Sequence, residues 1–225
     1  MGGELLRTRR RTVLTAVGSV GALSLAGCLG DEQTAETEQS NSEDQSLHPR
    51  YGYPSTSMDD DEPVPSDHEI NLMIGSPAEG SDHPTFYFDP VGLAIEPGDV
   101  VRFNFNTLDH AVAVLHEDFG PVHRAPEGAP PVSSPLMATG TYWLCEFSEP
   151  GVWDLYCPPH ERFGMGMRLV VGDGLEGPAA NPIDPDTDEG RIPDEPLVSL
   201  LNHDGIDPER ILEAGSVAWS ELDEE

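Results

Sequence analysis

Short runs in which apolar and polar residues alternate occupy the middle of the chain. From Val101 to Phe105 every second residue is apolar, which is typical of a strand with one buried face. Comparable runs, separated by Gly, Pro and Asp, predict strands over 68–74, 85–88 with 91–95, 100–105, 111–115, 142–147, 152–156 and 167–171. Helical periodicity is nearly absent from this region. The pattern therefore predicts an all-β fold, a Greek-key β-sandwich.

Segments rich in Gly and Pro interrupt this pattern and follow it. Residues 117–135 hold five Pro and two Gly, so we expect mostly loop there. Residues 174–190, rich in Gly, Pro and Asp, indicate a linker. Asp207 and Pro208 then stand in the order of an N-cap and a first helical residue, which predicts a short helix. Its apolar face would carry Ile211, Gly215, Trp219 and Leu222, and either packing on the sandwich or docking of a partner would cover that face.

The N-terminal residues have the features of an export signal. Arg10 and Arg11 are followed by a spacer and two apolar residues, which is the twin-arginine pattern. The apolar run over 12–26 is too short to span a hydrocarbon core of about 30 Å comfortably. We therefore expect a signal peptide over residues 1–27, with an uncleaved signal anchor as the alternative.

The apolar run ends in Leu25-Ala26-Gly27-Cys28, which resembles the lipobox of secreted lipoproteins. That resemblance implies cleavage before Cys28 and a lipid anchor on its sulfur. We therefore expect the protein at the extracytoplasmic face of the cell membrane, where disulfides are permitted.

The stretch that follows the lipobox is acidic and poor in large apolar side chains. Residues 29 to about 65 are rich in Asp, Glu, Ser, Gln, Thr and Pro. Such a composition cannot compensate the entropy of ordering the chain, so we predict an acidic disordered linker over 28–65. The predicted organisation is a signal peptide (1–27), this linker (28–65), a β-sandwich domain (66–173) and a C-terminal extension (174–225).

Charge excludes several classes of partner. The chain has eleven Arg and no Lys against forty-two acidic residues, which gives a formal net charge of −31. Electrostatic binding to nucleic acid or to an anionic membrane surface is therefore not expected. Adaptation to high salt is the simplest interpretation, since an acidic surface stays soluble there, and an acidic docking face for a basic partner is the alternative.

Ligands for a soft metal are concentrated in one predicted loop. Cys157, His160 and Met165 stand in the spacing C-x2-H-x4-M. Thiolate, imidazole and thioether all bind copper, and the sulfur ligands disfavour magnesium and calcium. A trigonal copper centre needs a second His from elsewhere in the fold. His110 lies at a turn between two predicted strands and is the candidate for that ligand.

Other residues stay open as ligands. Met167 is an alternative to Met165 in the axial position, and His116 shares strand parity with His110. His123, in the Pro-rich loop, is a further alternative. We interpret the remaining histidines as solvated: His48, His68, His83 and His203.

Cys145 is the remaining cysteine within the predicted sandwich. It alternates with Trp143 and Phe147, which indicates a buried position facing the core rather than a ligand or a disulfide partner. A disulfide between Cys145 and Cys157 would remove the thiolate from the predicted copper site.

With these residues considered, the chain resembles the cupredoxins, or blue copper proteins, and particularly plastocyanin and the halocyanins of halophilic archaea. The resemblance covers roughly 66–173 and rests on three motifs: the Cys-x-Pro-His-x4-Met loop, the Glu-Pro-Gly-Asp turn ahead of the His strand, and the Pro-Gly turn ahead of the Cys strand. It implies one type 1 copper ion held by the imidazoles of His110 and His160, the Cys157 thiolate and a weak axial Met165. The family usually has Asn directly after the first His, where this chain has Ala111, so a side-chain brace of the loop is absent.

The resemblance also implies a function. A centre whose positions are all filled by protein leaves no place for a substrate, and copper keeps nearly the same geometry in both oxidation states. We therefore expect no enzyme but a monomeric electron carrier, which shuttles single electrons between membrane-bound redox complexes, with an apolar patch of Pro159 and Phe163 around His160. The alternatives are a copper-binding or copper-delivery module, and a cupredoxin-fold interaction domain without a redox role.

Overall fold

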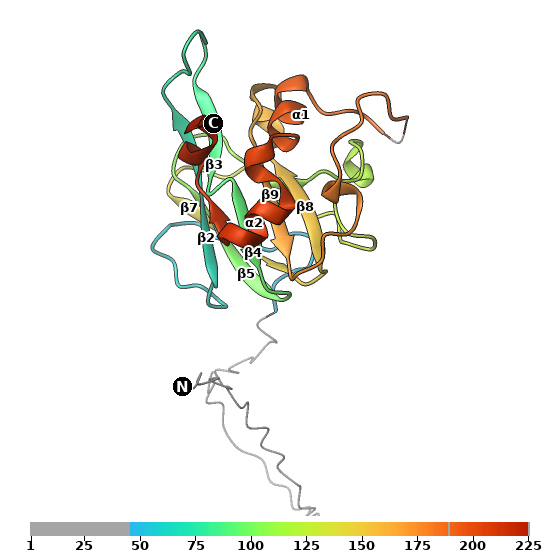
Figure 1. Cartoon of the computed structure of the whole chain (residues 1–225). Helices are drawn as coiled ribbons and strands as arrows, with labels where there is room; N and C mark the ends of the chain where they lie inside the picture. The colour runs from blue at the N-terminus through green and yellow to red at the C-terminus, as the bar shows by residue number, and fades with distance from the viewer. Residues whose placement is uncertain (1–45, 189, 225) are drawn as a thin grey trace, which may run out of the picture. The chain divides into compact units, whose positions relative to one another are not determined.

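The computed structural model describes residues 46–188 and 190–224, which form a sandwich of two β-sheets (Figure 1). One sheet has the strand order β1-β7-β5-β2-β3 and the other β10-β4-β9-β8-β6. The first sheet contains β1 (Tyr53–Pro54), β2 (His68–Gly75), β3 (Thr85–Asp89), β5 (Asp99–Phe105) and β7 (Thr141–Phe147). The second contains β4 (Gly92–Ile95), β6 (Ala113–Val114), β8 (Gly151–Tyr156), β9 (Gly166–Val171) and β10 (Ser216–Val217). The all-β sandwich predicted from the alternation is confirmed.

Aromatic side chains fill the space between the sheets, because alternate residues of each strand point inward. Phe103 on β5 lies opposite Trp143 on β7, with ring centroids 5.4 Å apart. Phe147 meets Trp153 of the other sheet edge to face at 5.2 Å. Cys145 is 1% exposed and free in the same core, so the predicted inward position is confirmed.

The outer face of β5 and β7 is also covered. Val100, Tyr142 and Leu144 form a second buried cluster, against which Leu47 and Tyr53 pack. A sheet with both faces buried needs a segment outside the sandwich to cover it. That segment is the chain between residues 47 and 66.

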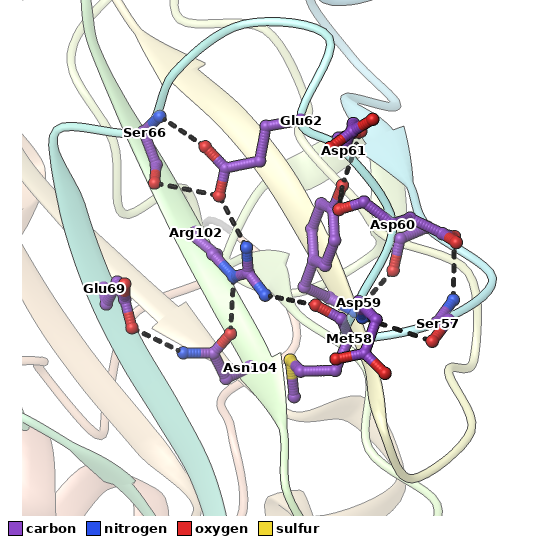
Figure 2. Close-up of polar contacts among 12 residues, drawn as sticks. Ser57, Met58, Asp59, Asp60, Asp61, Glu62, Ser66, Glu69, Arg102 and Asn104 are labelled. Atoms are coloured by element: carbon purple, nitrogen blue, oxygen red, sulfur yellow. Dashed lines mark hydrogen bonds and ion pairs between the residues drawn. The ribbon is translucent and has the colours of Figure 1, made fainter.

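Polar contacts fix this covering segment, as Figure 2 shows. Arg102 of β5 donates to Glu62 at 2.6 Å and to the carbonyl of Met58 at 3.0 Å, and its guanidinium lies 3.9 Å from the ring centroid of Tyr142. Ser66 donates its backbone N–H to Glu62 at 2.8 Å. Glu62 is thus the partner of a cation, and Asp60 accepts hydrogen bonds from Thr56 and Ser57, so the segment is not a solvated tether.

The predicted linker over 28–65 is therefore wrong from residue 46 onward, and the folded domain starts before residue 66. Tyr53 and Pro54 pair with Leu144 and Trp143, and the Trp143 indole donates to the carbonyl of Tyr51 at 2.7 Å. A two-residue strand leaves no periodic signal, and an acidic composition does not show which carboxylate pairs with the partly buried Arg102. The predictions for residues 1–45 lie outside the described residues.

The C-terminal extension also differs from its prediction. It contains two α-helices, α1 (Glu195–Leu201) and α2 (Pro208–Ala214), and strand β10, which pairs with β4. Asp207 caps α2 by accepting the N–H of Glu209 at 2.9 Å, as predicted, but Gly215 ends the helix with a φ of 76°. The apolar face of α2 packs on the sandwich through Ile211, which is fully buried.

Five 3-10 helices complete the described chain: η1 (Glu117–Phe119), η2 (Pro158–Phe163), η3 (Pro178–Ala180), η4 (Asp204–Ile206) and η5 (Trp219–Glu224). The region 117–135 is otherwise free of regular helix and strand, as predicted. None of the helices in the described ranges has both the length and the apolar character needed to span a bilayer.

A buried ionic triad joins the extension to the sandwich. Asp154 on β8 is fully buried and accepts from Arg124 at 2.9 Å and from Arg168 at 2.8 Å. Arg124 also donates to the carbonyls of Pro178, Ala179 and Asn181, and Arg168 donates to the carbonyls of Leu201 and Ile206. The predicted linker over 174–190 is thus held by hydrogen bonds at its centre.

Candidate metal centre

The loop between β8 and β9 is closed by backbone hydrogen bonds. Cys157 follows the last residue of β8 and donates its N–H to the carbonyl of Met165 at 3.0 Å. His160 donates its N–H to the carbonyl of Cys157 at 2.9 Å, which turns the imidazole back toward the sulfur. Gly164 ends η2 with a φ of 78°, a left-handed conformation that favours glycine. The tight spacing C-x2-H-x4-M therefore forms one compact turn.

His110 reaches this turn from a separate segment. Its carbonyl accepts the N–H of Met137 at 2.9 Å, and the preceding Asp109 has a φ of 62°. The ring is fully buried, and its Nε2 lies 2.8 Å from the hydroxyl oxygen of Thr107. With Nε2 bonded to Thr107, Nδ1 is the nitrogen available to a metal.

Three buried donor atoms converge at one end of the sandwich. The sulfur of Cys157 lies 3.7 Å from Nδ1 of His110 and 3.4 Å from Nδ1 of His160, and the two nitrogens are 3.2 Å apart. Atoms bound to one ion at about 2.0–2.3 Å, with angles of about 105–120° between the bonds, lie about 3.2–3.8 Å from one another. The observed triangle therefore fits one metal ion, and two imidazoles with a thiolate are the donor set that suits copper.

The methionine is placed by the same loop. Met165 and Met167 are both fully buried. The carbonyl of Met165 accepts the N–H of Cys157, whereas Met167 lies within β9 opposite Leu155. The loop closure thus brings the backbone of Met165, rather than that of Met167, directly to the cysteine.

Burial sets the protonation of the donor atoms. Desolvation, with a contribution from His160, lowers the pKa of His110 to about 4. Desolvation also lowers the pKa of His160, against an opposite effect of Asp109. Burial raises the pKa of the Cys157 thiol to about 12, although backbone N–H groups of Ala111 and His160 act in the other direction. At neutral pH the imidazoles are neutral and ready to bind, and a metal must displace the thiol proton.

Two neighbours of the centre were not found by sequence reasoning. Thr107 fixes the ring of His110, and its hydroxyl also lies 3.3 Å from the carbonyl of Leu72. Phe86 of β3 stacks on the ring of His160, with centroids 4.1 Å apart. A hydroxyl three residues before the candidate His110 was the available signal for Thr107, whereas nothing in the spacing points to Phe86.

The surface around His160 is partly covered. His160 is 9% exposed, and Phe163 packs against Phe86 with ring centroids 4.9 Å apart. Pro159 is exposed, as expected for a contact patch. Leu108 and Leu136 are 64% and 65% exposed and lie on the segments that flank His110 and its partner Met137.

The rival histidines lie elsewhere. His116 and His123 form a second group with Glu117, whose donor atoms lie within 4.8 Å of one another. Their ring nitrogens already have partners: the N–H of Asp118 donates to Nδ1 of His116 at 3.1 Å, and Nδ1 of His123 contacts the Glu117 carboxylate. The group contains no sulfur ligand and does not include His110.

The other histidines do not belong to the donor triangle. His68 pairs with Asp99 at 2.8 Å, His203 accepts the N–H of Gly205, and His48 accepts from the chain that follows it. His83 packs against Phe163, with ring centroids 4.9 Å apart. The predicted lipid anchor at Cys28 lies outside the described residues.

The sequence is similar to those of known proteins. Residues 77–172 match the family model of copper binding proteins, plastocyanin/azurin family. Pseudoazurin of Paracoccus pantotrophus is 30% identical over 111 residues, covering 48% of this chain and 66% of the relative. Plastocyanin of Prochlorothrix hollandica is 30% identical over 94 residues, covering 41% of this chain and 68% of the relative.

The matched part is shorter than the relatives themselves. The chain spans 66% and 52% of the pseudoazurins of Paracoccus pantotrophus and Methylorubrum extorquens. The crystal structure of pseudoazurin from Methylobacterium extorquens AM1 aligns with a TM-score of 0.39 and 21% identity, over 66% of this chain and 97% of that one.

Proposed function

Because this chain belongs to the copper-binding plastocyanin/azurin family, we propose that it is a type 1 copper electron carrier. The observation that carries the proposal is the buried triangle formed by the sulfur of Cys157 and the Nδ1 atoms of His110 and His160. Met165, whose backbone closes the loop on Cys157, would add a weaker thioether ligand to the three. The bound copper ion supplies a one-electron couple.

The chain's own residues limit rearrangement of the site. Thr107 holds the His110 ring through Nε2, and the N–H of Ala111 donates to the Cys157 sulfur at 3.4 Å. Water is excluded because the donor residues are between 0% and 9% exposed. Ligands that stay in one geometry in both oxidation states suit electron transfer. With every position filled by protein, a substrate has no place to bind, which favours a carrier over an enzyme.

The location and the partners are part of the proposal. The twin-arginine pattern and the lipobox-like Leu25-Ala26-Gly27-Cys28 support export and lipid anchoring at the extracytoplasmic face of the membrane. Electron donor and acceptor would then be membrane-bound redox proteins. The net charge of −31 without a single Lys supports a halophilic source and a carrier of the halocyanin type.

Copper delivery is the second candidate function. A delivery protein must release its ion to a partner, so its ligands need to be accessible. Here the three donor residues are buried and do not lie in an exposed Met- or His-rich segment. An interaction domain without copper would have no need for a convergent donor triangle.

The copper proposal is tested by adding Cu(II) to the purified domain. We expect an intense blue thiolate-to-copper absorption band and a reversible one-electron couple. Cys157→Ser should abolish the band, whereas Cys145→Ala, which changes a buried cysteine outside the donor triangle, should keep it. A colourless native protein, or a Cys157→Ser variant that stays blue, would refute the proposal.

The anchor is tested separately by fractionating cells that produce the full chain. Cys28→Ser should move the protein from the membrane to the soluble fraction. Membrane attachment that is unchanged in this variant would exclude the lipid anchor without affecting the copper proposal.

A further inference from the structure

The copper loop, residues 157–165, is bound from outside by the C-terminal extension. Glu161 lies within this loop, and its side chain is only 12% exposed. Two nitrogens of the Arg191 guanidinium donate to its two carboxylate oxygens at 2.7 and 2.9 Å, and the N–H of Asp194 donates to the same carboxylate at 3.1 Å. A bidentate pair of this kind fixes direction as well as distance.

Arg191 is itself held in place through its backbone. Its N–H donates to the carbonyl of Gly120 at 3.0 Å, and its carbonyl accepts the N–H of Val122 at 3.0 Å. The two segments form a parallel bridge at Pro121. The guanidinium therefore extends to Glu161 from a fixed point of the chain, not from a free tail.

Helix α1 also packs directly against the copper loop. Gly164 and Gly166 flank Met165, and both lie against the start of this helix. A Cβ atom at Gly166 would lie 2.4 Å from Cδ1 of Leu197, and one at Gly164 would lie 3.0 Å from the carbonyl oxygen of Pro196. Leu197 is fully buried. The helix and the loop backbone are thus in close contact on both sides of the axial ligand.

The far end of α1 is fixed as well. Arg168 of β9 donates to the carbonyl of Leu201, the last residue of the helix, at 2.9 Å. The same guanidinium is held by Asp154 of β8. Figure 1 shows α1 at the end of the sandwich where β8 finishes and β9 begins. A helix fixed at both ends resists movement of the loop beneath it.

We propose that residues 191–201 are a positioning element for the copper loop, with Glu161 and Arg191 as its positioning residues. The element keeps His160 and Met165 in one arrangement in the metal-free and the metal-bound protein, and so slows the loss of copper. The effect on copper rests on the proposed function, but the effect on the loop does not. Contacts that orient metal ligands from outside typically change metal affinity about 10–100-fold.

The test compares the full native chain with Arg191→Ala in two measurements. Transfer of copper from the loaded protein to an excess chelator should be about tenfold faster in the variant. Hydrogen exchange of the metal-free protein should be faster at the backbone amides of 157–166 and unchanged in β5 and β7. Arg191→Lys keeps the charge but cannot donate two parallel hydrogen bonds. Its rates of copper loss and of amide exchange should lie between those of the native chain and of Arg191→Ala.

Two further variants make the result specific. Arg210→Ala removes the same charge from helix α2, outside both the loop and residues 191–201, and should leave both measurements unchanged. Glu161→Gln should reproduce the Arg191→Ala effect, and the double variant should be no worse than either single one.

Native loop exchange and native copper loss in Arg191→Ala would overturn the proposal, and so would equal effects of Arg210→Ala. Faster exchange throughout the molecule would also overturn it, since that result indicates general destabilisation. If the native chain takes up no copper, the proposed function fails, while the exchange measurement still decides whether the extension holds the loop.

Discussion

At the scale of single residues, the donor set follows from residue type and spacing, while its support follows from the fold. Cys157, His160 and Met165 are close in sequence, so their chemistry is visible in the spacing alone. His110 could be predicted because a trigonal copper centre requires a second imidazole and this residue lies at a turn between two predicted strands. Thr107 was missed, because its bond to His110 depends on a turn that contains Asp109 in a left-handed conformation.

Replacing Thr107 tests this support. Thr107→Val removes the oxygen that faces Nε2 of His110 and leaves the side-chain volume nearly unchanged. We expect copper affinity to fall about 10–100-fold, as for other losses of a ligand-orienting contact. Competition with a chelator of known affinity measures it. Thr85→Val, which removes a hydroxyl that donates to the carbonyl of Ser76 at the start of β3, is the control and should bind copper normally.

Glu62 offers a test that depends on pH. Burial opposes its ionisation, but hydrogen bonds from Arg102 and Ser66 outweigh that effect and lower the pKa of Glu62 below its usual 4.5. Because the folded-state pKa is depressed, the stabilisation is present above the unfolded-state value and is lost as the pH falls through the folded-state pKa.

Glu62→Gln should therefore lower the free energy of unfolding by about 1 kcal/mol at pH 7, since the pair is mostly buried. The difference from the native protein should shrink below pH 4.5. Urea titrations of both proteins from pH 7 to pH 3 measure it, with the exposed Glu79→Gln as reference. A difference that does not change with pH would contradict the role of the carboxylate charge.

At the scale of elements, strands with clear alternation were predictable and short elements were not. The predicted run over 100–105 became β5 (Asp99–Phe105), and 142–147 became β7. Strands β1 and β10 have two residues each, and α1 has seven. None of them is long enough to show a periodic pattern of apolar residues in the sequence. Their positions depend on tertiary partners such as Trp143 and Leu197.

The packing of α1 against β9 can be tested at Gly166. Gly166→Ala places a methyl group where Leu197 already lies, so we expect a loss of about 1–3 kcal/mol from overpacking. The double variant Gly166→Ala/Leu197→Ala should lose less than the sum of the two single losses, because the smaller residue makes room. Urea unfolding of the metal-free protein measures the cycle. Additive losses would show that the two side chains do not overlap. Gly174→Ala serves as a control, because a Cβ atom there would meet only the backbone nitrogen of Gly151, at 4.0 Å.

At the scale of the whole molecule, sandwich and extension form one folded body within the described residues. The predicted boundary at residue 173 falls where the chain leaves β9, but Arg124 and Arg168 bind carbonyl groups beyond it. Composition identified Gly, Pro and Asp and so predicted a linker over 174–190. Composition could not show that backbone carbonyls of this segment accept hydrogen bonds from a buried arginine.

A chain ending at residue 173 tests this unity. It would leave Arg124 and Arg168 without their carbonyl partners and expose the apolar surface that Leu201 and Ile206 cover. Loss of partners from a buried ionic group costs about 3–5 kcal/mol, which is comparable to the stability of a whole domain. We expect no cooperative thermal transition by circular dichroism. A sharp transition like that of the native chain would contradict the inference.

Residues 184–186, between the sandwich and helix α1, are exposed and therefore accessible to a protease. A single protease cut there would break the chain between two parts that hold each other through Asp154, Arg168 and Leu197. The two fragments should then stay together and elute as one species under native conditions. The extension thus packs on the sandwich as one subunit packs on another. The two fragments on either side of residues 184–186, if produced separately, should reassemble into one blue protein.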